Sequence, residues 1–240
     1  MGVKAIAFKV WGEFAHFRRF YTTSSPLTFS FPPPPTVRGM VGALLGYHKD
    51  EYIEKTNPLS VGVAINSPIR KLRLGINLIY TKGSRGFDPT LFKETPRTQV
   101  PFEFLRDASY TIFVSGDERV LEELYTLLKE HRTHYTLSLG LSECLADFAL
   151  EGFYTLEKCE RAGEVSTVVP VENLLSIDFS APQKLMKEKV PTALNQKREP
   201  LEFKEVLFNP DGGSLKGEFR DVWRVRETEK FVYLFTFPSQ

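Results

Sequence analysis

Aromatic, basic and hydroxyl side chains are mixed over a short stretch near the start of the chain, from Glu13 to Ser25. Aromatic rings can stack on unpaired bases, guanidinium groups can bridge phosphates, and hydroxyls can bond phosphates or 2′-hydroxyl groups. The stretch therefore has the composition of a platform for a single nucleic-acid strand. The alternative is structural, because phenylalanines three residues apart can simply anchor a loop to the core. The candidate contacts are His16, Phe17, Arg18, Arg19, Tyr21 and Ser24.

A second candidate for anion binding is Arg38 with Gly39, shortly after four consecutive prolines. We expect a helix to begin here, and the free N–H groups and positive dipole end of a helix N-terminus favour an anion. Arg38 would add a full positive charge, so we expect a phosphate site. A surface charge with no ligand is the alternative. The chain has no P-loop and no G-x-G-x-x-G motif, which argues against ATP or dinucleotide binding.

Catalytic or metal chemistry has weak support in the sequence. His16 is the best candidate for acid–base work, since it lies among arginines, but a hydrogen bond to the backbone or to RNA is the favoured interpretation. His131 and His134 have no H-E-x-x-H pattern around them and fit a position at a helix end. Cys144 and Cys159 lack C-x-x-C spacing. We therefore expect no metal and no cofactor.

The charge distribution of the chain agrees with a polyanion-binding surface. The 240 residues carry a net charge of only +1, with 42% hydrophobic and 25% charged residues, an ordinary globular profile. Residues 1–106, however, contain 15 Lys and Arg against 7 Asp and Glu, whereas residues 107–240 contain 16 against 23. Such asymmetry suggests one surface for polyanions and another for basic partners. We expect a cytoplasmic protein with no membrane segment.

Hydrophobic periodicity predicts an α+β fold that positions these residues. The order strand, helix, strands, helix, strand is that of a ferredoxin-like (RRM-like) βαββαβ domain, which many RNA-binding proteins share. Thr36 is the expected cap of the first helix and Asp117 that of the second. Arg106-Asp107 is the expected turn between two strands. The expected strands are 3–11, 60–66, 72–80, 100–105, 109–115 and 146–156, and the helices are 36–47 and 118–131.

The chain is expected to divide near residue 156. Residues 1–156 would form the ferredoxin-like domain, with a polar hairpin insertion at about 81–98. Residues 157–240 would form a smaller β-rich C-terminal region, because short apolar runs alternate there with turn signals such as Asn209-Pro210-Asp211-Gly212-Gly213.

Three stretches taken together resemble a known family. They are Phe8–Arg18 at the end of the first strand, the proline-rich entry Pro33–Ala43, and Leu139–Cys144. In combination and order they are similar to the CRISPR-associated family-five subunit of Cascade, a member of the RAMP superfamily. The match is best over residues 3–150.

The resemblance implies a non-catalytic subunit of a type I Cascade complex that caps the 5′ handle of the CRISPR RNA (crRNA) in antiviral defence. It implies a thumb-like insertion that packs across the RNA and the Cascade backbone subunit, with the large subunit docked nearby and target DNA contacted only indirectly. The thumb would carry Lys82, Arg85, Lys93 and Arg97.

Two alternatives remain at this point. One branch of the family cleaves precursor crRNA without a metal, and here His16 or Tyr21 would have to serve. The other alternative is a protein-only assembly subunit whose exposed aromatic residues meet a partner.

Overall fold

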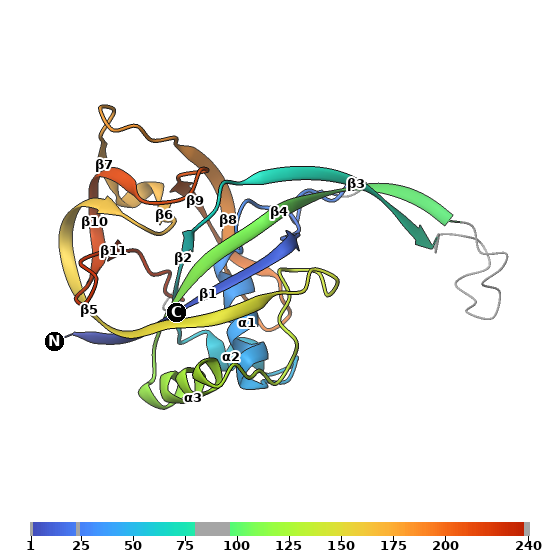
Figure 1. The fold of residues 1–240 in the computed structure, drawn as a ribbon, viewed down its shortest axis with the longest axis horizontal. Helices are drawn as coiled ribbons and strands as arrows, with labels where there is room; N and C mark the ends of the chain where they lie inside the picture. The colour runs from blue at the N-terminus through green and yellow to red at the C-terminus, as the bar shows by residue number, and fades with distance from the viewer. Residues whose placement is uncertain (1, 23–24, 80–96, 238–240) are drawn as a thin grey trace.

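The computed structural model describes residues 2–22, 25–79 and 97–237. The fold is α+β, with a mostly antiparallel sheet and few helices (Figure 1). The elements are β1 (Val3–Ala15), α1 (Pro34–Leu45), α2 (Tyr52–Thr56), β2 (Ser60–Ile65), β3 (Arg70–Ile79), β4 (Arg97–Ser115), α3 (Glu118–Lys129), β5 (Asp147–Val165), β6 (Val169–Pro170), β7 (Leu174–Ile177), β8 (Met186–Leu194), β9 (Pro200–Phe208), β10 (Leu215–Val225) and β11 (Phe231–Val232), with a short 3₁₀ turn at Val171–Asn173.

The centre of the sheet has the strand order β5-β1-β4-β2, and every neighbouring pair is antiparallel. α1 follows β1 and α3 follows β4, and both helices lie on the same side of the sheet (Figure 1). Side chains alternate between the two faces of a strand, so Ile6, Phe8 and Val10 of β1 enter the core shared with the helices. Ala5 and Ala7 belong to a smaller cluster that includes Phe113, Leu156 and Val225.

β1 is central, as its apolar pattern predicts, but it is longer than expected. It continues to Ala15 because Gly12, Phe14 and Ala15 keep pairing with β4. The loop that carries the aromatic and basic residues therefore begins only at His16.

The first helix begins earlier than predicted, at Pro34. Pro33 is the N-cap residue, and no side chain caps the helix, so Thr36 lies inside the first turn. Proline is tolerated there because the N–H groups of a first turn have no partner within the helix. The second helix, α3, has the predicted cap, since Asp117 accepts a hydrogen bond of 3.0 Å from the backbone N–H of Arg119.

The two strands predicted at 100–105 and 109–115 are one strand, β4. Asp107 adopts a φ of 52°, which distorts the strand locally without reversing it. β1 pairs on both sides of this point, with Gly12 opposite Ala108 and Phe14 opposite Arg106. The predicted turn at Arg106-Asp107 is therefore wrong, because pairing with a long central strand keeps the chain extended.

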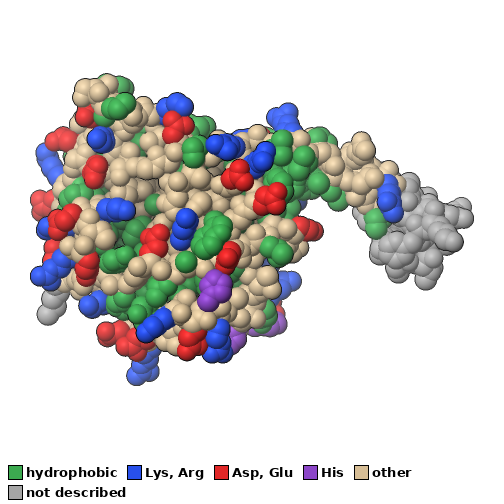
Figure 2. Space-filling model, in the orientation of Figure 1, with side chains coloured by type: hydrophobic (Ala, Val, Ile, Leu, Met, Phe, Trp, Pro, Cys, Tyr) green, Lys and Arg blue, Asp and Glu red, His purple; other side chains and the backbone are tan. Residues whose placement is uncertain are grey.

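β3 and the first half of β4 form an arm that extends beyond the rest of the sheet (Figure 1). Leu72, Leu74 and Leu78 lie on one face of β3, each between 36% and 38% exposed. Phe102 lies opposite Leu74 on β4 and belongs to the same face. The other face carries the polar side chains of Lys71, Arg73 and Asn77 together with exposed Ile79. Figure 2 shows apolar side chains gathered where the arm leaves the body.

The C-terminal strands continue the main sheet and add a second one. β10 pairs with β5, β7 and β11, while β6, β9 and β8 form a separate three-stranded sheet. The expected domain boundary at 156/157 falls inside β5. Val190, Val206 and Phe208 of the smaller sheet join the same core as α1. The apolar runs predicted as strands in this region are 165–169, 174–177, 201–207, 219–225 and 231–237. β8 is not among them, because Lys187, Glu188, Lys189 and Pro191 interrupt its short apolar pattern.

No helix in the described ranges combines the length and the apolar character that crossing a bilayer requires.

Candidate nucleic-acid interface

His16 and Phe17, the first two residues of the predicted platform, are buried. His16 is 1% exposed, and its Nδ1 lies 2.7 Å from the backbone oxygen of Glu103. The ring lies against both Phe102 and Phe104, and Nε2 has no hydrogen-bond partner among the described residues. Burial lowers the pKa of His16, because the apolar surroundings disfavour the charged ring. Neither residue is placed to contact RNA, since Phe17 is only 3% exposed.

The two arginines that follow have different environments. Arg18 is exposed, and its guanidinium donates a hydrogen bond of 3.4 Å to the backbone oxygen of Thr22. Arg19 pairs with the buried carboxylate of Glu188 at 2.5 Å. Glu188 also accepts hydrogen bonds from the N–H and the hydroxyl of Ser30. The charge of Arg19 is therefore used to attach the loop to β8, and only Arg18 offers a free guanidinium to a ligand.

Tyr21 keeps the exposure that stacking on a base requires. It is 55% exposed, and its hydroxyl accepts a hydrogen bond of 2.8 Å from Arg19. Phe20 lies against its ring and also against Phe203 of β9. His16 is buried against Phe102 and Phe104, and no contact joins it to Tyr21 in the described part of the chain. The two candidates named for the ribonuclease alternative therefore do not meet in one site.

Arg38 is not at the surface, so the predicted phosphate site at the start of α1 is wrong. The side chain is 3% exposed, and it donates hydrogen bonds to the backbone oxygens of Leu59, Thr192 and Phe235. Burial lowers the pKa of Arg38 to about 10, so the guanidinium stays charged at neutral pH. Arg38 fastens three chain segments together. Gly39 is only half-buried and does line a cavity.

Four of the predicted contacts, Ser24, Lys82, Arg85 and Lys93, lie outside the described residues. Arg97 is described, and it is exposed at the first position of β4, opposite Ile79 of β3. Of the predicted insertion at 81–98, the structure describes only residues 97 and 98, which belong to β4.

A groove of about 410 Å³ lies over the glycine face of α1. Gly39 and Gly42 are three residues apart and share this face of the helix. A Cβ at position 42 would lie 3.1 Å from the Cβ of Tyr52, which explains why glycine allows Tyr52 of α2 to approach the helix so closely. The residues lining the groove are Gly39, Gly42, Ala43, Tyr47, His48, Lys49, Tyr52, Tyr135 and Arg198.

The two ends of the groove are built by turns. α1 ends at Gly46, whose φ of 74° turns the chain so that Tyr47 and His48 line the groove. Tyr135 comes from the segment after α3, where its N–H donates a hydrogen bond of 3.1 Å to the backbone oxygen of Ala43. Its ring is 50% exposed. The groove therefore has aromatic side chains on both walls.

Arg198 reaches the groove from the β8–β9 loop. Its guanidinium lies 5.5 Å from the ring centre of Tyr52 and donates a hydrogen bond of 3.1 Å to the backbone oxygen of Lys49. Its backbone has a φ of 64°, a region that glycine or asparagine usually occupies. The conformation belongs to a tight turn, in which the N–H of Arg198 donates a hydrogen bond of 2.9 Å to the backbone oxygen of Asn195.

The electrostatics of the groove favour an anion. Lys49 and Arg198 are exposed cations, whereas the ring of His48 lies 3.4 Å from the carboxylate of Asp50. None of the described lining residues is acidic. Burial, helped by the negative charge of Glu123, raises the pKa of Tyr47, so this ring stays neutral. Aromatic faces beside cations can bind the base and the phosphate of one nucleotide together.

Sequence reasoning missed most of this groove. Of the lining residues, only Gly39 was named above as a candidate contact, as part of the expected phosphate site with Arg38. The i, i+3 spacing of Gly39 and Gly42, followed by Tyr47-His48-Lys49 just past the helix, is the signal that could have indicated a site. Arg198 gave no such signal, because 149 residues separate it from Lys49.

Comparisons with known proteins agree on one family. A family model described as CRISPR-associated protein (Cas_Cas5) matches residues 5–207. A CRISPR protein from Archaeoglobus fulgidus has a similar structure, with a TM-score of 0.55, 13% identity, and coverage of 97% of this chain and 99% of that one. No curated protein sequence matches the chain.

Two solved assemblies also contain a chain with this fold. A chain of a CRISPR RNA-guided surveillance complex has a TM-score of 0.52 and 13% identity, covering 89% of this chain and 91% of that one. A chain of the type III-B Cmr-beta complex bound to cognate target RNA and AMPPnP has a TM-score of 0.50 and 9% identity, covering 94% and 98%. At such identities the likeness is one of fold.

Proposed function

The chain belongs to the CRISPR-associated Cas5 family, and we propose that it is the non-catalytic, crRNA-binding subunit of a cytoplasmic type I Cascade complex. In this role it caps the 5′ handle of the crRNA. The observation that carries the proposal is the groove over α1, where aromatic rings and two exposed cations face the same space without an acidic neighbour in its lining. A single RNA strand needs these two kinds of contact.

The geometry of the groove suits a short, unpaired end of RNA. Arg198 is already fixed by the ring of Tyr52 and the carbonyl of Lys49, so little side-chain entropy is lost when it contacts a phosphate. Tyr135 offers an exposed ring on the opposite wall for a base. Arg18 and Tyr21 supply a second exposed pair, on the loop after β1.

The finer fold assignment is part of the proposal. We infer that β1, α1, β2, β4, α3 and β5 form the ferredoxin-like core expected of RAMP proteins. The strand order β5-β1-β4-β2, with a helix after the first and third of these strands in the chain, supports this assignment.

The exposed apolar face of the arm supports the proposal that this chain packs against other subunits of a complex. An isolated two-stranded ribbon is marginally stable in water, and here one face exposes Leu72, Leu74 and Leu78. We propose that this face packs on the Cascade backbone subunit, and that Arg73 and Arg97 on the other face lie toward the RNA. The large subunit would dock nearby, with target DNA contacted only through the assembled complex.

The proposal is tested by handle-RNA binding across a salt series, with the full chain and with the assembled complex. Lys49→Ala with Arg198→Ala should weaken binding by roughly tenfold or more and make the salt slope shallower by about 0.7 for each phosphate that the variant no longer neutralises. Lys158→Ala with Arg161→Ala is the matched control, because it removes the same charge from exposed positions of β5. Equal slopes for both double variants would show that the groove does not hold the RNA backbone.

The ribonuclease alternative has a separate test. Labelled repeat RNA is incubated with the protein in EDTA, and the non-catalytic role predicts that it stays intact. A discrete cut that requires neither metal nor partner would overturn that part of the proposal. The protein-only alternative predicts partners that co-purify after nuclease treatment, with no protected RNA.

A further inference from the structure

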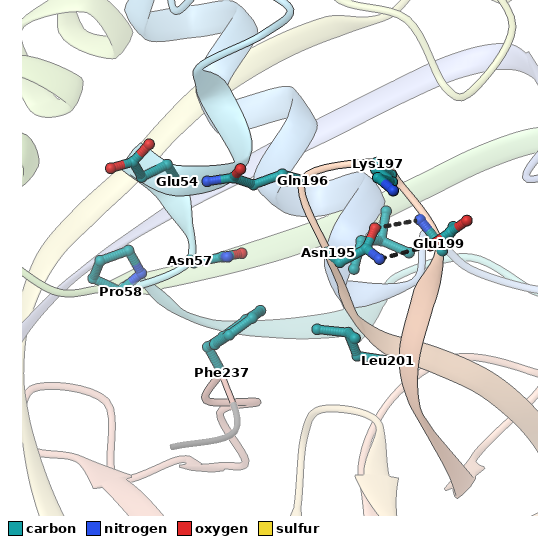
Figure 3. A pocket seen from close by; sticks show the side chains of 10 residues that line it. Glu54, Asn57, Pro58, Asn195, Gln196, Lys197, Glu199, Leu201 and Phe237 are labelled. Atoms are coloured by element: carbon teal, nitrogen blue, oxygen red, sulfur yellow. Dashed lines mark hydrogen bonds between the residues drawn. The ribbon is translucent and has the colours of Figure 1, made fainter. Parts of the chain in front are cut away.

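A second, larger cavity lies on the other side of the 195–199 loop from the groove. Its volume is about 700 Å³, and it is bounded by α2, the β8–β9 loop and the C-terminal segment (Figure 3). Asn195, Gln196 and Lys197 of the loop line this cavity, whereas Arg198 lines the groove. One short loop thus separates the two spaces.

Phe237 forms an aromatic wall of this cavity. Figure 3 shows its ring pointing into the hollow, between Asn57 on one side and Leu201 on the other. The ring is held in place from behind, where the guanidinium of buried Arg38 lies 5.9 Å from the ring centre. Arg38 and Val61 also bind the backbone oxygen of Phe235, which fixes the segment two residues earlier. A fixed, half-buried ring provides a stacking surface at low entropic cost.

Two side-chain amides face the same space. Asn57 extends from the end of α2 and Gln196 from the β8–β9 loop (Figure 3). Among the side chains drawn, hydrogen bonds join only Asn195 and Glu199, so these two amides are not paired within the cavity lining. An amide presents a donor beside an acceptor, which is the pattern on the edge of every nucleobase.

The charges that line this cavity differ from those that line the groove, so the two spaces suit different parts of an RNA strand. Glu54 and Glu199 lie on its rim against one ammonium, Lys197. Two carboxylates disfavour a phosphate, but they can accept hydrogen bonds from the N–H groups of a base. The groove holds cations without a carboxylate in its lining. The backbone of an RNA strand would therefore follow the groove, and a base would turn into the cavity.

We propose that this cavity binds one unpaired nucleobase of the RNA, which stacks on Phe237 while Asn57 and Gln196 contact its edge. Arg38 is a positioning residue for this contact, since it touches Phe237 and not the base. The inference rests on the proposed RNA-binding function and adds to it a base-reading site contributed in part by the C-terminal region.

The test uses handle RNAs in which one nucleotide at a time is made abasic. With the wild-type protein, removal of one particular base should weaken binding by about 5- to 150-fold, the range expected for one stacked base. Phe237→Ala should bind the intact RNA as weakly as the wild type binds that abasic RNA, and it should be insensitive to the abasic change. Phe237→Trp should restore sensitivity. Asn57→Ala should reduce discrimination among the four bases at that position.

Several outcomes would overturn the inference. The inference is wrong if Phe237→Ala binds every RNA with the affinity of the wild type. It is also wrong if Phe237→Ala loses the same factor in affinity for the intact and the abasic RNAs. Loss of a co-purified subunit with unchanged RNA binding would identify the cavity as a protein contact. The groove variant Lys49→Ala with Arg198→Ala separates this question from the proposed function, because it should weaken all RNAs while keeping the sensitivity to that one base.

Discussion

Replacement of Arg38 should destabilise the fold and should not act by removing an RNA contact. Arg38 is 3% exposed and donates hydrogen bonds to the carbonyls of Leu59, Thr192 and Phe235. The substitution Arg38→Met keeps much of the side-chain volume and removes every donor. Because the three carbonyls belong to distant segments, the loss affects the packing of α1, β8 and the C-terminal segment together.

The magnitude follows from the number of carbonyls left without a partner. Phe235 retains a hydrogen bond of 3.0 Å from the N–H of Val61, so only the oxygens of Leu59 and Thr192 lose the partner that Arg38 gave them. A buried acceptor without a partner costs about 1–3 kcal/mol. The Met variant no longer buries a charged guanidinium, and this offsets part of the cost. We expect Arg38→Met to lower the free energy of unfolding by about 3 kcal/mol.

In urea unfolding, this change appears as a lower midpoint concentration of urea. The slope of the unfolding free energy against urea concentration should stay the same. Arg38→Lys should be intermediate, since an ammonium keeps the charge but not the planar set of donors. Arg18→Ala is the control, because an exposed arginine should change stability by less than about 0.5 kcal/mol. If Arg38→Met were as stable as the wild type, the buried structural role assigned to Arg38 would be refuted. Weaker binding of handle RNA at unchanged stability would mean that Arg38 acts on the RNA, either directly or through the ring of Phe237.

Two further predictions concern the buried histidine and the arm. Burial lowers the pKa of His16 below its usual 6.5, so the unfolded chain binds the proton first and stability falls as the pH drops through that value. His16→Asn should reduce the difference in urea midpoint between about pH 7.5 and pH 5.5, and an unchanged difference would contradict this. Leu74→Ser with Leu78→Ser should cost about 1 kcal/mol or less yet reduce co-purification of the backbone subunit, whereas Asn77→Ser should not. Equal recovery with all variants would contradict the proposed role of the arm.

The elements that could be predicted are those with a clear local signal. Mostly apolar residues on both faces of Val3–Trp11 indicated a central strand, and Asp117 before an amphipathic run indicated the start of α3. The sequence did not predict β8 or the continuity of β4, because long-range strand pairing overrides the local turn and charge signals there. The resemblance to the family rested on short stretches whose order, more than any single residue, was informative.

The candidate site shows the same division at the level of side chains. The sequence alone supplied the kinds of residue that bind RNA and the excess of basic over acidic residues in residues 1–106. It could not distinguish Arg18, which is exposed, from Arg19 and Arg38, which are bound to a carboxylate and to carbonyls from remote segments. The α1 groove likewise needs Tyr52 and Arg198, which meet only when β8 packs against α1. Residue type is a local property of the chain, but the availability of a charge or a ring depends on burial and on partners that only the folded chain brings into contact.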